Sequence, residues 1–274
     1  MEGMNILSLG LGVQSTALYY MSSMGELPRC DYAIFADPGH EKTETMNYLR
    51  YLKDWQKKNN GIPIIVLNGK NLYEDLLNQT NSTGQRFASI PAFTDGSIGM
   101  LRRQCTTEYK INPINKEIRR IYNGVGRLPK TNVWIGISLD EHDRMHLSKK
   151  AWRFNYYPFC GYKTDRKNAE KINTETMYRT EIMEWYNKHG LPIPVKSSCV
   201  FCPYQSDNAY LRMKRSYPED FADACNVDEA IRDSSKKGIK QQIFLHRSCK
   251  PLKNVQFDEL QTEWMDNCTD GCHI

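Results

Sequence analysis

The chain has 274 residues, of which 40% are hydrophobic and 25% are charged. These values are ordinary for a globular protein and argue against collagen-like, coiled-coil and disordered classes. No run of about 18 uncharged apolar residues occurs and no signal peptide is recognisable, so we expect a cytoplasmic protein that does not enter a membrane. The net charge of +5 permits an anionic partner without requiring one.

The first half of the chain alternates between strand and helix patterns. Short apolar runs predict buried strands, and apolar residues spaced three or four apart predict helices between them. This order argues for an α/β fold with a doubly wound, mostly parallel sheet. The strands are predicted at residues 4–9, 31–36, 62–67 and 131–137, and the helices at residues 15–25, 42–59 and 111–123.

The strand pattern fades after about residue 140. Helices are predicted at residues 174–189, 206–215 and 218–233. We therefore expect residues 1–140 to form an α/β core that binds a nucleotide and residues 141–274 to form a helical lobe. Residues 78–100 are rich in Asn, Thr, Ser and Gly, which predicts a mobile loop or lid.

A glycine-rich turn, Gly10 to Gly12, separates the first predicted strand from the first predicted helix, which opens at Ser15 and Thr16. Such a turn exposes backbone N–H groups, and the helix N-terminus adds positive potential, so a phosphate group fits there. A plain turn with a serine cap explains the same residues. The segment is not a Walker A loop, and it lacks the third glycine of a dinucleotide fingerprint.

This segment resembles the pyrophosphatase loop of the PP-loop ATPases, Ser-Gly-Gly-x-Asp-Ser. Gly12 and Ser15 match the second glycine and the final serine, whereas Leu11 replaces the first glycine and Gln14 the aspartate. The resemblance implies that ATP and Mg²⁺ bind at this end of the sheet. The residues that it implies for the nucleotide are Ser8, Gly10, Gly12, Gln14, Ser15, Thr16, Phe35 and Asp140.

Two further segments carry the resemblance. Residues 35–45, with Asp37, are similar to the Asp-Thr-Gly…Pro-Glu-Thr stretch of phosphoadenosine phosphosulfate reductases and their sulfurtransferase relatives. Residues 136–144 are similar to their Gly-x-x-x-(Asp/Glu)-(Ser/Glu)-x-x-Arg motif, which implies Arg144 as a phosphate or sulfate ligand and Asp140 or Glu141 as a Mg²⁺ ligand. Asp37 and Arg144 are therefore candidate catalytic residues. Turns, helix caps and their salt bridges explain both segments equally simply.

Three of the nine cysteines match a cluster motif. Cys199 and Cys202 form a C-x-x-C pair followed by proline. Residues 102–114, with Cys105, resemble segments of adenylylsulfate reductases and of DNA phosphorothioation sulfurtransferases. In those relatives this cysteine joins the distant pair on a 4Fe–4S cluster. The resemblance implies the same cluster here, and we expect Cys249 as its fourth ligand.

Alternatives to this ligand set remain open. Cys160 and Cys225 are other candidates for the fourth ligand, or one iron keeps an open site that holds a sulfide. Zinc, or free structural or redox thiols, explain the same cysteines without a cluster. Cys272 lies where a phosphoadenosine phosphosulfate reductase carries its nucleophile. The tail matches poorly, since His273 follows directly, so Cys272 is only an alternative catalytic nucleophile.

Residues 144–171 combine eight basic side chains with two acids and interleaved aromatic residues, a local charge of +6. This composition suits a single-stranded or flipped nucleotide. A solvated basic face over an aromatic core explains it as well.

Together the motifs imply an adenine nucleotide α-hydrolase fold and an ATP-dependent sulfurtransferase-like enzyme that forms AMP and pyrophosphate. The expected partners are an adenine nucleotide, a nucleic-acid acceptor and a sulfur donor such as a cysteine desulfurase, and we expect a homo-oligomer. The alternatives are a reductase of phosphoadenosine phosphosulfate or adenylylsulfate, and a non-catalytic nucleic-acid-binding protein with a structural metal.

Overall fold

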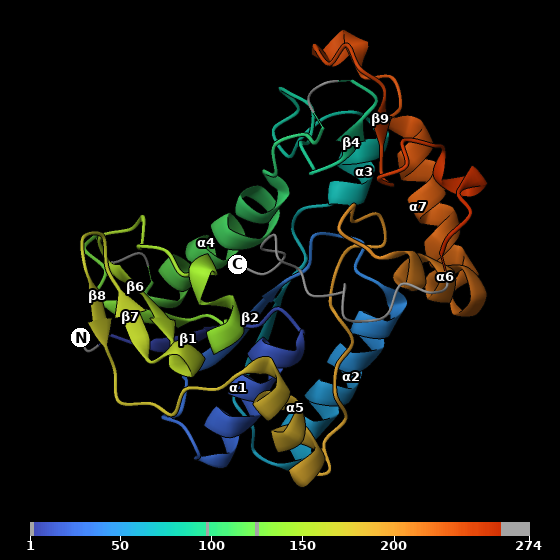
Figure 1. Ribbon diagram of the computed structural model, residues 1–274. Coiled ribbons are helices and arrows are strands. Elements are labelled where there is room, and N and C mark those ends of the chain that lie inside the picture. The colour runs from blue at the N-terminus through green and yellow to red at the C-terminus, as the bar shows by residue number, and fades with distance from the viewer. Residues whose placement is uncertain (1–2, 97–98, 124–125, 259–274) are drawn as a thin grey trace.

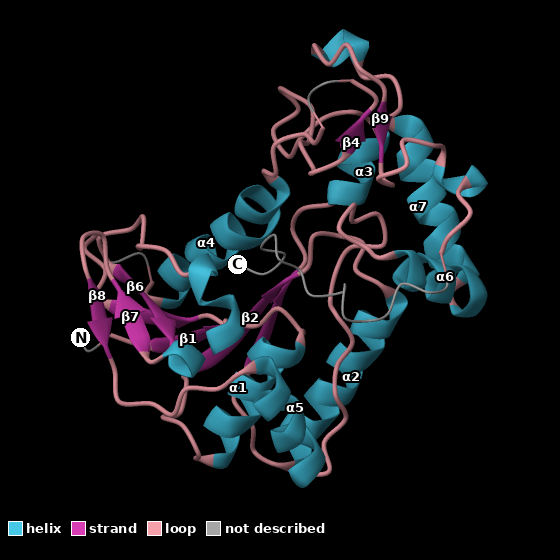
Figure 2. Ribbon diagram, in the orientation of Figure 1, coloured by secondary structure: helices cyan, strands magenta, loops and turns pink. Residues whose placement is uncertain are grey.

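A seven-stranded sheet forms the centre of the protein (Figure 2). The computed structural model describes residues 3–96, 99–123 and 126–258. The strand order is β3-β2-β1-β5-β6-β7-β8; the first five strands in this order run parallel, and β7 and β8 are antiparallel additions. The strands are β1 (Asn5–Ser8), β2 (Tyr32–Ala36), β3 (Ile64–Leu67), β5 (Thr131–Trp134), β6 (Arg153–Tyr157), β7 (Tyr162–Thr164) and β8 (Ala169–Lys171).

Helices cover both faces of this sheet (Figure 1). Neighbouring residues of a strand point to opposite faces, so Leu7 of β1 packs beneath α1, α2 and α5, whereas Ile6 packs against α4. The predicted α/β fold with a mostly parallel sheet is thereby confirmed, and helices on both faces are compatible with a doubly wound arrangement. The helices are α1 (Val13–Met24), α2 (Thr43–Lys58), α3 (Leu72–Leu77), α4 (Asn112–Ile121), α5 (Arg179–Lys188), α6 (Asp207–Ser216) and α7 (Pro218–Ala230).

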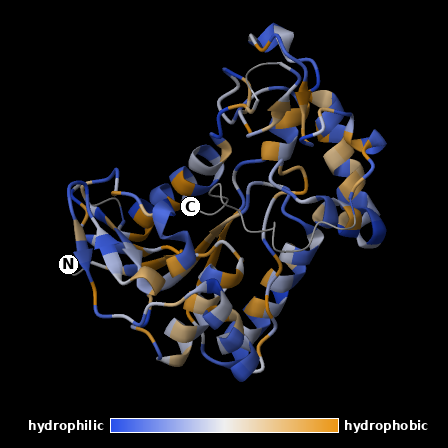
Figure 3. Cartoon of the chain, in the orientation of Figure 1, coloured by the Kyte–Doolittle hydropathy of each residue, from blue (hydrophilic) through white to orange (hydrophobic). Residues whose placement is uncertain are grey.

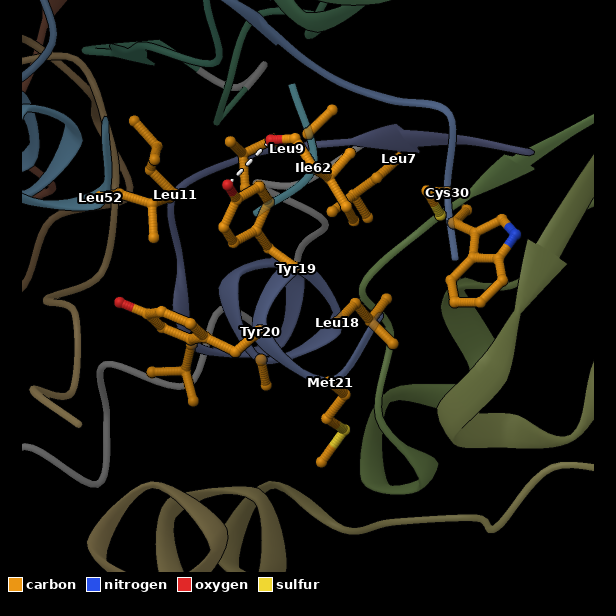
Figure 4. Close-up of a cluster of buried hydrophobic side chains, with 14 of the residues drawn as sticks. Leu7, Leu9, Leu11, Leu18, Tyr19, Tyr20, Met21, Cys30, Leu52 and Ile62 are labelled. Carbon is orange, nitrogen blue, oxygen red and sulfur yellow. Dashed lines mark hydrogen bonds between the residues drawn. The ribbon is translucent and has the colours of Figure 1, made fainter. Parts of the chain in front are cut away.

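The core beneath α1 fixes the start of that helix against the sheet (Figure 4). Tyr19 is completely buried, and its hydroxyl donates a hydrogen bond of 2.9 Å to the Ile62 carbonyl. Leu11, in the turn that precedes α1, is also buried. In Figure 3 the hydrophobic colour follows β2 and alternates with hydrophilic colour along the helices, as one-sided burial requires.

A second core lies beyond the carboxyl end of the sheet. Helix α3 packs against α7, and strand β4 (Phe93–Thr94) pairs antiparallel with β9 (Ile243–Phe244). Buried residues between 72 and 109 therefore share this core with residues from α6, α7 and β9. The segment 78–100 was predicted only as a loop, yet it contributes Phe87, Ile90 and Ala92 to this core.

The expectation of a helical region after residue 140 is wrong for residues 153–171, which form β6, β7 and β8. The reason is visible in β6, where Arg153, Asn155 and Tyr157 are the buried residues. The Arg153 guanidinium donates hydrogen bonds to the side-chain oxygens of Asn155, at 2.8 Å, and Asn115, at 3.0 Å. Because polar side chains occupy the inward positions, hydrophobic alternation could not reveal this strand. No helix within the described ranges is long and apolar enough to span a membrane.

Candidate functional site

The glycine turn after β1 lines a small pocket at the carboxyl ends of β1, β2 and β5, of about 40 Å³. Open α/β sheets bind their ligands at this edge. The structure brings six of the eight predicted nucleotide residues together here, and leaves out Thr16 and Asp140. We call this the loop pocket; it is lined by Ser8, Leu9, Gly10, Gly12, Gln14, Ser15, Phe35, Ala36, Lys110, Ile114, Ile135 and Gly136.

Ser15 holds the glycine turn in shape. Its hydroxyl accepts a hydrogen bond from the Gly10 N–H at 3.1 Å and donates to the Gly12 carbonyl at 3.3 Å. Leu11 between these glycines has a positive φ of 58°, a conformation that usually needs glycine. A leucine adopts this conformation here, and its side chain is buried in the core.

Gly136 allows β5 to approach this turn closely. A Cβ atom at this position would lie 2.5 Å from the Ser15 nitrogen and 2.7 Å from its Cα. Any side chain at position 136 would displace the backbone at the start of α1. Glycine is therefore required at position 136 for the close packing of the chain around the loop pocket.

Gln14 is the centre of a polar network at the mouth of this pocket. Its amide nitrogen donates to the Glu141 carboxylate at 3.0 Å and to the Ser138 hydroxyl at 3.3 Å, and its amide oxygen accepts from Arg179 at 3.1 Å. Arg144 pairs with Glu141 at 2.7 Å. Burial raises the pKa of Glu141 above its ordinary value, although Arg144 opposes this shift. A half-buried carboxylate thus stands beside the glycine turn.

The other predicted polar residues are placed differently. Thr16 is fully buried and does not line the loop pocket. Asp140 is exposed, and its carboxylate accepts a hydrogen bond of 2.8 Å from the Arg179 N–H at the start of α5. Asp37 directly follows β2 and accepts a hydrogen bond of 2.8 Å from the Gly39 N–H. Burial raises the pKa of Asp37.

Three of the predicted cluster cysteines, Cys105, Cys199 and Cys202, line a second pocket. We call it the thiol pocket; it is lined by Pro38, Leu72, Ile90, Pro91, Arg103, Cys105, Thr106, Lys110, Ser197, Ser198, Cys199, Phe201, Cys202, Pro203 and Tyr204. Cys105 immediately precedes a π-helical turn, Thr106–Ile111, a feature that often marks functional sites.

The C-x-x-C segment is hydrogen-bonded to the glycine turn and to the chain after β2. The Ser197 hydroxyl donates a hydrogen bond to the Gly10 carbonyl. The Lys42 N–H donates to the Ser198 carbonyl at 3.2 Å, and the Val200 N–H to the His40 carbonyl at 3.1 Å. The loop pocket and the thiol pocket are therefore neighbours, although their residues lie up to about 190 positions apart in sequence.

Lys110 lines both pockets. Its ammonium group donates to the Glu41 carboxylate at 2.7 Å, and the Glu41 side chain is completely buried. Burial alone would lower the pKa of Lys110, but the Glu41 carboxylate and the Cys199 thiol raise it above its ordinary value. Lys110 therefore carries a fixed positive charge between the two pockets.

The three thiols are partly buried. Burial raises the pKa of Cys105 and of Cys199, and this outweighs the opposing effect of Arg103 on Cys105 and of Lys110 on Cys199. Thiolates are the donors that iron–sulfur clusters and zinc prefer, so the three side chains fit such a group in type. In this structure no three His, Cys, Asp or Glu side chains of the described residues stand at metal-binding separation.

The predicted fourth ligand lies elsewhere. Cys249 contacts the Thr94 carbonyl at 3.6 Å, and its charged neighbours are Asp95 and Arg232. Cys249 does not line the thiol pocket, and the segment around it lies against β4. Cys160 is buried against the Ile137 carbonyl at 3.3 Å and Cys225 lies in α7, so neither lines the thiol pocket. Cys272 lies outside the described residues.

The basic and aromatic stretch 144–171 does not form one surface. Trp152, Tyr157 and Phe159 are buried, and Arg153 is enclosed by amide side chains. Three of the six aromatic residues of this stretch are therefore buried in the core. Lys149 is exposed and lines a separate cavity, described below.

Sequence reasoning gave no role to Lys110, Glu41 and Arg179. Lys110 lies in the segment 102–114, which carries part of the family resemblance, so its position in that segment could have indicated a role. Glu41 and Arg179 act through partners far away in sequence, which no local pattern reveals. Comparison with models of known protein families and with curated proteins finds no match to this chain.

Proposed function

We propose that this protein is an ATP-dependent sulfurtransferase-like enzyme of the PP-loop type, which forms AMP and pyrophosphate. One observation carries the proposal: Lys110 lines both the glycine-turn pocket and the pocket of the three thiols. A nucleotide-activated acceptor and a sulfur-bearing group would then both contact the ammonium group of Lys110. The family resemblance supplies the chemistry, and the shared lysine supports its use by this chain.

In the proposed reaction an acceptor oxygen attacks the α-phosphorus of ATP, and the bond to the β-phosphate oxygen breaks. Pyrophosphate leaves and the acceptor becomes adenylated. A sulfur nucleophile then attacks the activated carbon or phosphorus of the acceptor, and AMP departs with the oxygen. The N–H groups of the glycine turn would hold the phosphates. Glu141 would bind Mg²⁺ in place of the family's aspartate, because it is the carboxylate that faces Gln14.

The base would lie against the apolar wall of the loop pocket, formed by Phe35, Ile114 and Ile135. Lys110 would stabilise the negative charge that develops on the leaving groups. The acceptor is proposed to be a nucleic acid, and a cysteine desulfurase to be the sulfur donor.

Cys105, Cys199 and Cys202 would hold a 4Fe–4S cluster. When bound, such a cluster supplies an iron site able to bind sulfur. The three thiols must lose their protons to ligate it, which the positive charges of Lys110 and Arg103 favour.

The protein should be purified without oxygen and assayed for iron, acid-labile sulfide and zinc. We expect about four irons and four sulfides per chain. The variant Cys199→Ala/Cys202→Ala should lose them, and Cys249→Ala, which removes a thiol outside the thiol pocket, should keep them. A single zinc, or no metal, would refute the cluster. Loss of iron in Cys249→Ala would show that the cluster uses a ligand that the structure separates from the other three.

A further inference from the structure

A third cavity lies beside the Cys105 segment and is separate from the pocket proposed for ATP. Its volume is about 570 Å³. Cavities of this size accommodate ligands as large as a nucleotide. We call it the basic cavity; it is lined by Lys70, Asn81, Ser82, Thr83, Arg86, Arg102, Arg103, Gln104, Thr107, Glu108, Asn112 and Lys149.

The charge of this cavity is strongly positive. Five of its lining residues are basic and one, Glu108, is acidic. Glu108 is neutralised within the wall, because Arg86 pairs with it at 2.7 Å and Asn81 and the Ser82 N–H also donate to it. The charges of Arg86 and Lys70 both lower the pKa of this carboxyl, whereas the exposed Arg102 and Lys149 form no salt bridge with it.

Three of the cations are available to an anion. Lys70 donates to neutral oxygens only, the Ser82 hydroxyl at 2.8 Å and the Glu108 carbonyl at 3.0 Å. Arg102 and Lys149 are exposed. None of the three forms a salt bridge with a carboxylate of the described residues. Several uncompensated cations around one concave surface are typical of sites for phosphate-bearing ligands.

Arg103 joins this cavity to the thiol pocket, since it lines both. Its guanidinium also lies over the Tyr204 ring, 5.8 Å from the ring centroid. A ligand held in the basic cavity would therefore lie next to the segment that carries Cys105.

We propose that the basic cavity binds the phosphate groups of a nucleotide or nucleic-acid acceptor and places it beside Cys105. The lining of the cavity by itself supports a phosphate-binding site, whereas the role of the bound molecule as acceptor rests on the proposed function. Phosphodiesters of a chain and the phosphate of a free nucleotide share this chemistry, and the experiment separates them.

The test is fluorescence anisotropy of a labelled single-stranded 12-mer oligonucleotide, without ATP, across a salt series. The variant Arg102→Ala/Lys149→Ala should weaken binding tenfold or more and reduce the slope of log K against log salt by about 1.4, the value for two lost contacts. The matched control is Lys236→Ala/Lys237→Ala, which removes two exposed charges outside the cavity and should change neither. Thermal melting checks that each variant is folded.

Competition with thymidine 5′-monophosphate identifies the source of the phosphate. If thymidine 5′-monophosphate displaces the oligonucleotide at a similar concentration, the ligand is a free nucleotide. If it does not displace the oligonucleotide, the ligand is a polynucleotide. Equal weakening in both double variants, or no binding of either probe, would overturn the proposal. Ser15→Ala should leave oligonucleotide binding intact, so failure of the nucleotide chemistry is distinguishable from failure of this site.

Discussion

The side-chain amide of Gln14 donates a hydrogen bond to the Glu141 carboxylate, with 3.0 Å between Nε2 and Oε2. A neutral donor at position 14 allows the Glu141 carboxylate to lie against the side chain of Gln14, which lines the loop pocket. The resembled PP-loop has aspartate at position 14, and two carboxylates at this distance would repel each other. In this chain the carboxylate beside position 14 belongs to Glu141.

The variant Gln14→Glu tests this relationship because it replaces the amide by a carboxylate of the same size. We expect destabilisation of up to about 1.4 kcal/mol at pH 7.5, corresponding to roughly one pKa unit of like-charge repulsion, because Arg179, which donates to the side chain at position 14, offsets part of the repulsion. The penalty should shrink as the pH falls, since one of the two carboxyl groups then becomes protonated. Urea unfolding at pH 7.5 and pH 5 measures it. The swap Gln14→Glu/Glu141→Gln should recover part of the loss; no recovery would contradict the pairing.

Glu141 also predicts a pH dependence of Mg²⁺ binding. Because burial raises its pKa, the carboxylate takes up a proton at a higher pH than an ordinary glutamate. Mg²⁺-dependent nucleotide binding should therefore weaken as the pH falls through that raised pKa. In Glu141→Gln the Mg²⁺ requirement should rise about tenfold at pH 7.5, or about 1.4 kcal/mol, and this pH dependence should disappear. Asp140→Asn is the control, because Asp140 bonds to the start of α5; a larger effect there would reverse the assignment.

The Lys110–Glu41 pair predicts a large stability effect. In Lys110→Met the Glu41 carboxylate stays buried without its cation, which should cost about 3–5 kcal/mol of unfolding free energy. Lys110→Met/Glu41→Gln should be clearly more stable than the single variant, because no unpaired charge remains. Lys57→Met, which breaks an exposed pair with Asp54, should change stability by less than about 0.5 kcal/mol. Similar small losses in both single variants would refute the role given to Lys110.

Gly136→Ala should damage the loop pocket directly. Its Cβ would approach the Ser15 nitrogen to 2.5 Å, so the backbone must shift at a cost of about 1–3 kcal/mol. We expect adenine nucleotide affinity to fall at least tenfold, as measured by calorimetry. Gly126→Ala, where a Cβ meets nothing within 4 Å, is the matched control. Unchanged affinity in Gly136→Ala would show that the nucleotide binds elsewhere.

Those parts of the fold that depend on apolar strands were predictable. β1 and β2 are buried on both faces, so their apolar runs and the helices between them indicated a parallel sheet correctly. β6 was missed because its inward residues include Arg153 and Asn155, which bond to each other instead of to water. The pattern of hydrophobic residues reveals a buried strand only where the buried side chains are apolar.

The candidate site was likewise predictable only in part. The glycine turn and the two cysteine segments were visible because each is a local motif. Their proximity was not, since it depends on Ser197 reaching the Gly10 carbonyl and on Lys110 reaching Glu41. Cys249 was chosen as a ligand for its loop-like surroundings, which carry no information about distance.

Equilibrium binding of ATP and of phosphoadenosine phosphosulfate, with Mg²⁺, tests the central claim most directly. Both nucleotides should be titrated into the wild-type protein and into Ser15→Ala, which removes the hydroxyl that holds the glycine turn. Our account predicts that ATP binds, that it binds more tightly than phosphoadenosine phosphosulfate, and that Ser15→Ala weakens it about tenfold or more. Preference for phosphoadenosine phosphosulfate would indicate a reductase instead. Absence of binding of either nucleotide would contradict the account and leave a non-catalytic nucleic-acid-binding protein as the better reading.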